Sequence, residues 1–448
     1  MSNSLKTHIQ QLYNGNDSPL APEASQREAL QLVGQKKFPG PKHEAWRHTD
    51  ISPLLGHGYQ KARPKKIDVQ AVSKYQVPDM EVNLLVFVNG FLNWDLSRIQ
   101  DTEEDIIIKP LAKARQEHAA IVEKYFEHTG IRETNIFSAM NTAYAPDGLF
   151  IYVPKGKSVK YPVHLLHLGH PEGEELLAHP RNLFVADEIS YVKIMESYHG
   201  HSDGTLLTNV ATEMIVKRSA HVDYYILQSE GDNNYQVNHL FVNQLEGSMF
   251  NCNTLTLCGG LIRNEIHLTQ EEEHCQASLY GLFLGKRKQH FDNYVVSNHL
   301  KPDGRSNQVY RGIMDGPSSA VYFGKVYVAP DAQQVYTEQS NKNVLIGSES
   351  TVHSKPQLEI YADDVACAHG STTGQLEKDA IFYLRARGIE KNAAQAMLLY
   401  AFADEILQKI TLPPLKALGE KLLLQHLHGG NMDKQCSQTF AALTGQES

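Results

Sequence analysis

The spacing of apolar positions divides the chain into three parts, of which residues 1–145 form the first. Apolar residues there recur mainly at helical spacing, and Leu111–Phe126 is rich in Ala and long side chains. One strand is expected over Val82–Val88, an almost continuous apolar run that ends at an Asn-Gly turn. The pattern predicts a mainly helical N-terminal region.

From residue 146 to 372 the helical spacing gives way to short apolar or alternating runs between Gly, Asn, Asp and Pro turns. An open antiparallel sheet of this length would curl or split, whereas a β-helix stacks short strands and protects their edges by repetition. No fixed sequence period is visible. We predict a β-helix core, with strands at Leu149–Val153, Val163–Leu168, Val210–Val216, Val222–Leu227, Val237–Val242, Asn253–Leu257, Leu279–Leu284, Val321–Val328 and Leu358–Tyr361.

Helical spacing returns in residues 373–448. Gln375–Arg387 has apolar residues on one face and stops at a glycine, which is a common residue just after a helix end. A second helix is expected over Ala393–Ile410, before two prolines, and a third over Leu415–Leu427. The pattern predicts a C-terminal helical region.

Charge and composition exclude several classes of protein. The formal net charge is −9, without a basic stripe, and this argues against nucleic-acid binding. No apolar run of about 18 residues and no signal-peptide pattern occurs, so we expect a soluble, cytoplasmic protein that does not enter membranes. Hydrophobic residues make up 41% of the chain, which is enough for a large core.

The five cysteines have irregular spacing and an odd count, which does not suggest a disulfide framework. No Cys-x-x-Cys occurs, so the chain lacks the closely spaced thiolates of a self-sufficient ferredoxin or zinc-finger site. We therefore expect reduced thiols, and any metal would need scattered or shared ligands. The cysteines are Cys252, Cys258, Cys275, Cys367 and Cys436.

Cys367 and His369 form the strongest candidate metal site. Their i, i+2 spacing puts both side chains on one face of a strand, where a thiolate and an imidazole can bind the same iron. The alternative is structural, because cysteine is often simply buried. Two ligands cannot complete a tetrahedral site, so the others would come from a partner surface or from sulfide. Asp363 and Asp364 could supply oxygen ligands, but such acidic pairs are more often turn residues.

Histidines elsewhere could form an iron path if folding brings them together. The candidates are His274, His290, His299 and His353, although most histidines in a protein are exposed or hydrogen-bonded.

Two enzymatic alternatives can be compared with the sequence. The Gly-Lys-Ser at 156–158 lacks the earlier glycine of a phosphate loop, because Ile151 stands there, so we expect this chain to bind no ATP. No nucleophile elbow or dinucleotide fingerprint occurs. A carbohydrate-active β-helix enzyme would use clustered carboxylates and is commonly secreted, unlike a chain without an export signal.

The C-terminal helices have more apolar residues than one packed face needs. Met397, Tyr400 and Phe402 lie close together, with Arg385 and Arg387 nearby. Core packing is one explanation. The other is a helix-in-groove contact with a partner protein through these five residues.

Several motifs resemble the SufB/SufD family of iron-sulfur cluster assembly proteins. The longest, at Ser354–Gly388, reads SKPQLEIYADDVACAHGSTTGQLEKDAIFYLRARG, and its Cys-Ala-His-Gly followed by Gly-Gln-Leu is similar to the SufD branch. The lack of cysteines before Cys252 also differs from SufB proteins. Further matches are Asn141–His164, Gln289–Asp292 with His299, Ala332–Gln334 and, more weakly, Glu44–Thr49.

The resemblance implies a right-handed parallel β-helix flanked by helical regions, in a non-catalytic scaffold subunit. It implies pairing with a SufB-like paralogue through the β-helix and with a SufC-like ATPase through the C-terminal helices. A transient iron-sulfur cluster or iron would form at the subunit interface, where this chain would aid iron entry, and the motif favours a metal role for Cys367 and His369. A SufB-like or homodimeric scaffold acting alone is the alternative.

Overall fold

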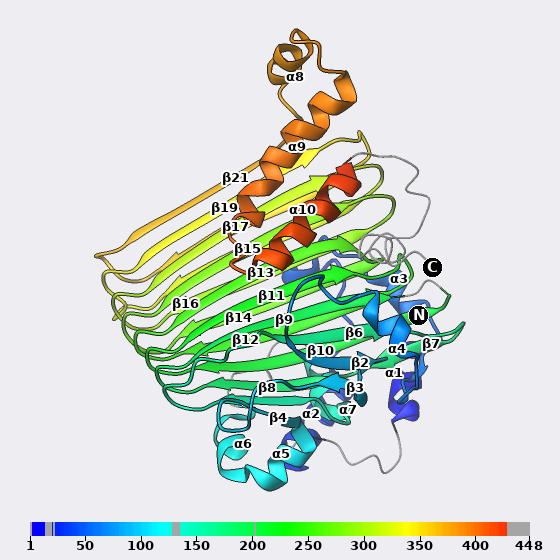
Figure 1. Cartoon of the computed structure of the whole chain (residues 1–448), viewed down its shortest axis with the longest axis vertical. Coiled ribbons are helices and arrows are strands. Elements are labelled where there is room, and N and C mark those ends of the chain that lie inside the picture. The colour runs from blue at the N-terminus through cyan, green and yellow to red at the C-terminus, as the bar shows by residue number, and fades with distance from the viewer. Residues whose placement is uncertain (1, 14–19, 21–22, 128–134, 201–202, 428–448) are drawn as a thin grey trace.

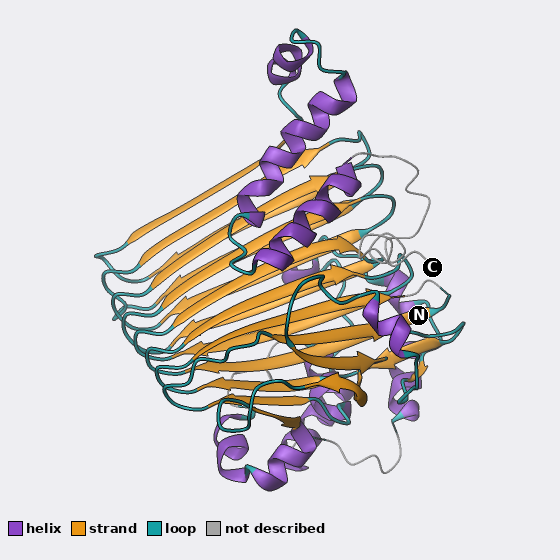
Figure 2. Cartoon of the chain, in the orientation of Figure 1, coloured by secondary structure: helices purple, strands orange, loops and turns teal. Residues whose placement is uncertain are grey.

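A computed structural model shows a solenoid of two stacked β-sheets with helices packed on the outside (Figures 1 and 2). Alternate strands along the chain join alternate sheets, so that each coil gives one strand to each sheet. The β-helix prediction is thereby confirmed. Of the 448 residues, the structure describes residues 2–13, 20, 23–127, 135–200 and 203–427.

The first sheet has the strand order β20-β18-β16-β14-β12-β10-β8-β5-β4, with β1 and β7 beside it. Its strands are β1 (Gln60–Lys61), β4 (Ile107–Pro110), β5 (Leu149–Val153), β7 (Glu175–Ala178), β8 (Arg181–Ala186), β10 (Thr205–Val216), β12 (Tyr235–Gln244), β14 (Leu261–Gln270), β16 (His290–His299), β18 (Ser319–Val328) and β20 (Thr351–Ile360).

The second sheet has the order β21-β19-β17-β15-β13-β11-β9-β6-β2-β3. Its strands are β2 (Asn83–Val88), β3 (Phe91–Arg98), β6 (Val163–Gly169), β9 (Tyr191–Gly200), β11 (His221–Ser229), β13 (Met249–Cys258), β15 (Gln276–Gly285), β17 (Arg305–Met314), β19 (Tyr336–Leu345) and β21 (Ala366–Gly374).

Coils of unequal length explain why the sequence has no fixed period, although the strands of neighbouring coils stay in parallel register. Along the first sheet, Tyr235 pairs with Leu261, Leu261 with His290, His290 with Ser319, and Ser319 with Thr351. The coils between these positions are 26 to 32 residues long. Turns of different length absorb the variation, while the strands stay aligned.

Helices precede and follow the solenoid. The α9–α10 pair lies across the outer face of the second sheet, and α8 projects beyond the body (Figure 1). The helices are α1 (Ser2–Leu12), α2 (Glu23–Gln35), the 3₁₀ helix η1 (Glu44–Trp46), α3 (Ser52–Leu55), α4 (Val69–Ser73), α5 (Leu111–Glu117), α6 (Ala119–Tyr125), α7 (Ile136–Tyr144), α8 (Lys378–Arg385), α9 (Lys391–Leu407) and α10 (Pro413–Leu427). No described helix is long and apolar enough to cross a bilayer.

The N-terminal region is richer in strands than its pattern indicates. The strand predicted over Val82–Val88 is confirmed as β2, but β1, β3 and β4 were not predicted. Of these, β1 and β4 form by pairing with distant segments, β7 and β5, and periodicity cannot detect such pairing. In contrast, β3 forms a hairpin with β2 across the Asn89-Gly90 turn. The helix expected over Leu111–Phe126 is broken at His118, whose backbone (φ −129°, ψ 36°) is not helical.

Two C-terminal helix boundaries differ from expectation. The helix α8 begins at Lys378 rather than Gln375, because β21 continues to Gly374. The third helix, α10, begins at Pro413 rather than after the prolines, since proline fits the first turn of a helix.

The space between the sheets is filled by apolar side chains, among them Leu165, Tyr224 and Phe250. Buried amides also bond to one another there: Gln228 Nε2 donates to Gln236 Oε1 (2.8 Å) and to Asn264 Oδ1 (2.9 Å). Because buried polar groups need partners, these bonds between coils hold strand register.

The segment around η1 is fixed to the outer face of the first sheet by a buried charged network. Trp46 stacks on the Arg263 guanidinium, 3.8 Å from the ring centroid. Arg263 bonds to Glu265 (2.6 Å) and to Asp292, which also accepts a bond from Thr49. Burial alone would raise the pKa of Glu265, but Arg263 and His239 hold it well below its usual value.

Candidate functional site

The last coil of the solenoid, formed by β20 and β21, is exposed, and we call it the open end (Figure 1). In β17 most inward-facing residues are buried, whereas Ala368–Gly374 of β21 is exposed throughout. Each of the two strands is the last in its sheet. Their outer edges therefore present backbone groups that could pair with another strand.

Cys367 and His369 lie on β21, where Cys367 pairs in register with Thr337 and His369 with Gln339. Cys367 is partly buried against the apolar cluster that contains Val326 and Val335, and His369 is exposed. Burial raises the pKa of the Cys367 thiol, so it stays protonated at neutral pH until a metal displaces the proton.

The face of β21 that holds this pair looks across the solenoid toward β20. Ser371 shares that face because alternate residues of a strand point the same way, and its Oγ donates to Ser354 Oγ of β20 (2.7 Å). The structure thus brings Cys367 and His369 to the inner side of the open end, where side chains of another protein could reach them.

Two rows of hydrogen-bonded polar side chains lie in the coils that precede β21, directly next to Cys367 and His369. The sequence analysis did not predict them. Under Cys367, Thr337 bonds to Ser306 (2.9 Å), which bonds to Nε2 of His299 (2.9 Å). Burial lowers the pKa of His299 to about 4, so this imidazole is neutral at pH 7.

Under His369, Gln339 Nε2 donates to Gln308 Oε1 (3.2 Å), which also accepts from Tyr322 (3.1 Å). Gln339 Oε1 is buried and has no hydrogen-bond partner among the described residues. A spacing of 31 residues, from 306 to 337 and from 308 to 339, is the signal that could have revealed both rows.

No group of three or more His, Cys, Asp or Glu side chains within the described ranges could hold a metal ion. Asp363 and Asp364 are exposed, and the backbone of Asp364 bonds to Gln333 and Gln334, as expected of turn residues. The pair on β21 would therefore need ligands from beyond the described residues.

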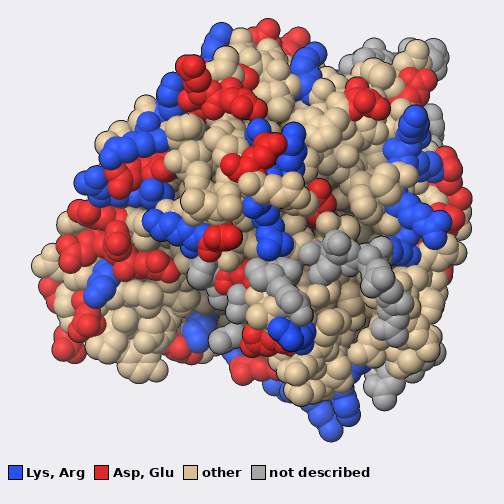
Figure 3. Space-filling view, turned by 90° about the horizontal axis from the view of Figure 1, so that it is seen from below, with Lys and Arg blue, Asp and Glu red and all other residues tan. Residues whose placement is uncertain are grey.

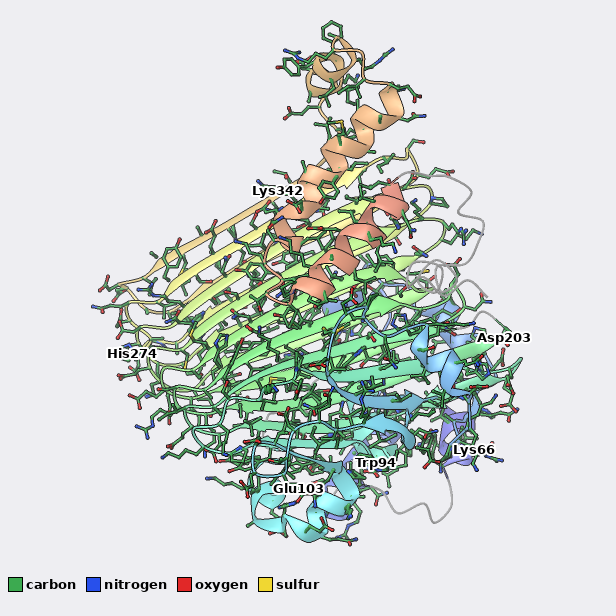
Figure 4. The ribbon with its side chains drawn as sticks, in the orientation of Figure 1. Lys66, Trp94, Glu103, Asp203, His274 and Lys342 are labelled. Carbon is green, nitrogen blue, oxygen red and sulfur yellow. The ribbon has the colours of Figure 1, made fainter. Side chains whose placement is uncertain are left out.

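The other candidate histidines do not converge on the pair. His299 ends the row beneath Cys367. His290 bonds to Ser319 (2.7 Å) and to Thr49 near η1, and His353 stacks on His48 with ring centroids 3.8 Å apart. His274 lies in a turn at the side of the solenoid, and its Nδ1 is 3.6 Å from Oδ2 of Asp303 (Figure 4).

The remaining cysteines offer little reactivity. Cys252, Cys258 and Cys275 are buried free thiols, and burial raises the pKa of Cys252 to about 12. Cys436 lies outside the described residues.

The five residues predicted to contact a partner through the C-terminal helices differ in exposure: three are exposed and two are partly buried. Met397 is 51% exposed, and Arg385 and Arg387 are exposed. Tyr400 and Phe402, in contrast, pack partly against the cluster beneath α9 and α10. Sequence reasoning did not assign two exposed aromatic side chains of α8, Phe382 (74%) and Tyr383 (57%), to a partner surface.

Arg387 lies 3.4 Å from the Tyr383 ring centroid, so α8 presents an aromatic and cationic surface away from the body. Among the described helices α8 contributes no buried residue, and packing within this chain does not account for its aromatic side chains.

Comparison with known proteins agrees with this architecture. A family model described as the SufBD core domain of SUF-system FeS cluster assembly matches residues 170–402, and one for the SufBD N-terminal region matches residues 6–165. A Synechocystis iron-sulfur cluster assembly SufBD family protein is 30% identical over 399 residues, covering 87% of each chain. Escherichia coli SufD is 26% identical over 428 residues, covering 94% of this chain and 96% of SufD, and Bacillus subtilis SufD is 22% identical, covering 70% and 72%. The chain belongs to the SufB/SufD family of iron-sulfur cluster assembly proteins.

Proposed function

We propose that this chain is a SufD-type, non-catalytic scaffold subunit that helps a nascent iron-sulfur cluster to form between itself and a SufB-like subunit. The observation that supports this most is the position of Cys367 and His369 on a terminal strand, which pairs along one edge only. Strand pairing across the open end would place a partner's side chains beside them. The partner or inorganic sulfide then supplies the missing ligands, and the site assists iron entry.

The chemistry follows from the ligands. Iron displaces the Cys367 proton, and the raised pKa of this thiol makes iron binding weaker as the pH falls. The exposed His369 supplies an imidazole nitrogen, and the row of Gln308 and Gln339 supports the backbone from which it projects. A site with so few ligands from one chain suits transient assembly more than permanent storage.

Anaerobic reconstitution of the complex with a SufB-like partner tests the site. We expect Cys367→Ser and His369→Gln each to leave complex formation intact and to weaken iron binding by about tenfold or more, measured by iron counting and absorbance. Thr372→Val on the same strand is the control. Equal iron in all four proteins would remove the pair from the site.

The same proposal assigns α8 and the exposed part of α9 to a SufC-like ATPase, which would hydrolyse the ATP while this chain binds none. Phe382, Tyr383 and Met397 supply the apolar contacts, and Arg385 and Arg387 flank them. The assembly would work in the cytoplasm.

A Phe382→Ser/Tyr383→Ser double variant tests this surface, because both side chains are exposed and their loss leaves the core intact. We expect pull-down of the ATPase to fall by about tenfold or more, since exposed aromatics commonly dominate such contacts. Val69→Ser, at a 66% exposed residue on α4, is the matched control. Undiminished capture by the double variant would place the ATPase elsewhere.

A further inference from the structure

Two motifs noted in the sequence, Glu44–Thr49 and the start of Ser354–Gly388, meet in the fold although about 310 residues separate them. They line a groove of about 540 Å³ at the edge of the open end, which we call the rim groove. Its lining residues are Glu44, Ala45, Arg47, His48, Val321, Phe323, Val352, His353, Ser354, Lys355, Ser371 and Thr373. The proposed function makes no use of this groove.

Cations outnumber carboxylates around the rim groove. Lys355 pairs with Glu44, and Lys325 pairs with Glu359 (2.7 Å). Arg47 is exposed and has no ion-pair partner in the part of the chain that the structure describes. Lys355 first, and then Arg47 and Lys325, lower the pKa of Glu44. One positive charge is therefore left without a counter-ion.

Neutral donors face the same space. Ser371 and Ser354 hydroxyls are bonded to each other (2.7 Å), and Thr373 follows on β21. His48 and His353 stack at 3.8 Å with an interplanar angle of 12°. Burial and the neighbouring His48 lower the pKa of His353, which favours its neutral form.

The groove also has apolar lining residues. Val321, Phe323 and Val352 line it, and the Lys355 ammonium lies 5.4 Å from the ring centroid of Phe323, its neighbour in register. A groove that combines cations and hydroxyls with apolar side chains is typical of a site for a small organic molecule with an anionic group.

We propose that the rim groove binds a small organic anion through its carboxylate or phosphate group, with Arg47 and Lys355 as the charged contacts. Hydroxyls of Ser354 and Thr373 donate further hydrogen bonds, while Ser371 donates to Ser354 and orients its hydroxyl. Phe323 and Val352 contact the carbon skeleton. Because Ser371 shares a face of β21 with His369, the ligand lies next to the candidate metal pair. All residues that line the rim groove belong to this chain. Anion binding in the groove therefore does not depend on the proposed scaffold function.

Isothermal titration calorimetry on the full chain, with inorganic phosphate and citrate as probes, tests the proposal. We expect saturable binding of at least one probe, weakened about tenfold or more in both Arg47→Gln and Lys355→Gln. Lys342→Gln is the matched control, because it removes an exposed lysine on β19, outside the groove (Figure 4). Stronger citrate binding would identify a carboxylate ligand, and stronger phosphate binding a phosphate ligand.

Two results would overturn the proposal. One is no saturable binding of either probe by the wild-type chain. The other is an equal loss of affinity in all three variants, which would show non-specific attraction to the surface. Both lining cations are exposed, so their variants should fold, and unchanged melting temperatures without ligand would verify this.

Discussion

At the scale of single residues, burial determines the charge of several histidines. His167 lies between the rings of Phe87 (4.6 Å) and Tyr198 (4.3 Å), and burial first, then His164, lowers its pKa to about 3. The pKa values of His164 and His179 fall to about 4 and 3 for the same reason. In the unfolded chain these groups titrate near 6.5, so below that pH the unfolded state binds more protons. Stability is therefore complete above about pH 6.5 and declines as the pH falls toward 3–4.

A His167→Phe variant should reduce this acid sensitivity. Phenylalanine keeps a flat ring between Phe87 and Tyr198, and His167 Nε2 has no hydrogen-bond partner among described residues. Between pH 6 and 4, we expect the free energy of unfolding to fall less steeply with decreasing pH in the variant than in the wild type. The two slopes should differ by about 1.4 kcal/mol per pH unit. Urea unfolding at several pH values measures the slope, with exposed His274→Gln as the control. A slope equal to the wild type's would contradict a buried neutral His167.

At the scale of elements, the edge of β21 decides whether another chain can pair there. The Ala366 N–H donates to the carbonyl of Val335, which directly precedes β19. In a regular parallel ladder the even-numbered N–H groups of β21 therefore bond to the β19 side, and the odd-numbered N–H groups point outward. Thr373→Pro would remove an outward donor and should abolish pairing with the proposed SufB-like partner at little cost in stability. Thr372→Pro should instead destabilise the fold, because it removes a bond to β19.

Co-purification and thermal melting separate these outcomes. Thr373→Val loses the hydroxyl that accepts from Asn343 (3.2 Å) but keeps the N–H, and it should still bind the partner. If Thr373→Pro assembled as well as Thr373→Val, the edge of β21 would not be the contact.

Strand character also explains how much of the fold the sequence could predict. Apolar runs such as Leu279–Leu284 predicted their strands, because both faces of that segment are buried. The strands β19 and β21 went unnoticed, since β19 alternates inward polar residues with exposed ones and β21 is almost wholly exposed. Cys367 and His369 were found from spacing and resemblance. Their partners in register, Thr337 and Gln339, depend on coil length, which varies. The exposure of Phe382 and Tyr383 depends on how α8 packs, which its apolar spacing does not show.

At the scale of the whole molecule, the two ends of the solenoid differ. At the first end, inward residues such as Leu85, Phe87 and Ile108 are buried, and the terminal strands are antiparallel. The edge strand β4 has only four residues and ends at Pro110, features that discourage further pairing. Figure 3 views the molecule from this end and shows acidic and basic side chains interspersed. Within the described residues, the open end combines exposed inner residues with two long strands, β20 and β21, that each have one free edge.

A solenoid with one open end should form closed pairs and not fibres. If two copies pair through their open ends, the contact is isologous and uses both edges, so no surface remains for a third copy. We expect the isolated chain to shift from monomer to dimer with rising concentration and to go no further, as measured by analytical ultracentrifugation. Thr373→Pro should stay monomeric, and a SufB-like partner should displace the second copy because it uses the same edge. Steady growth to larger species would mean that the first end also pairs, in conflict with its antiparallel terminal strands and the short edge strand β4.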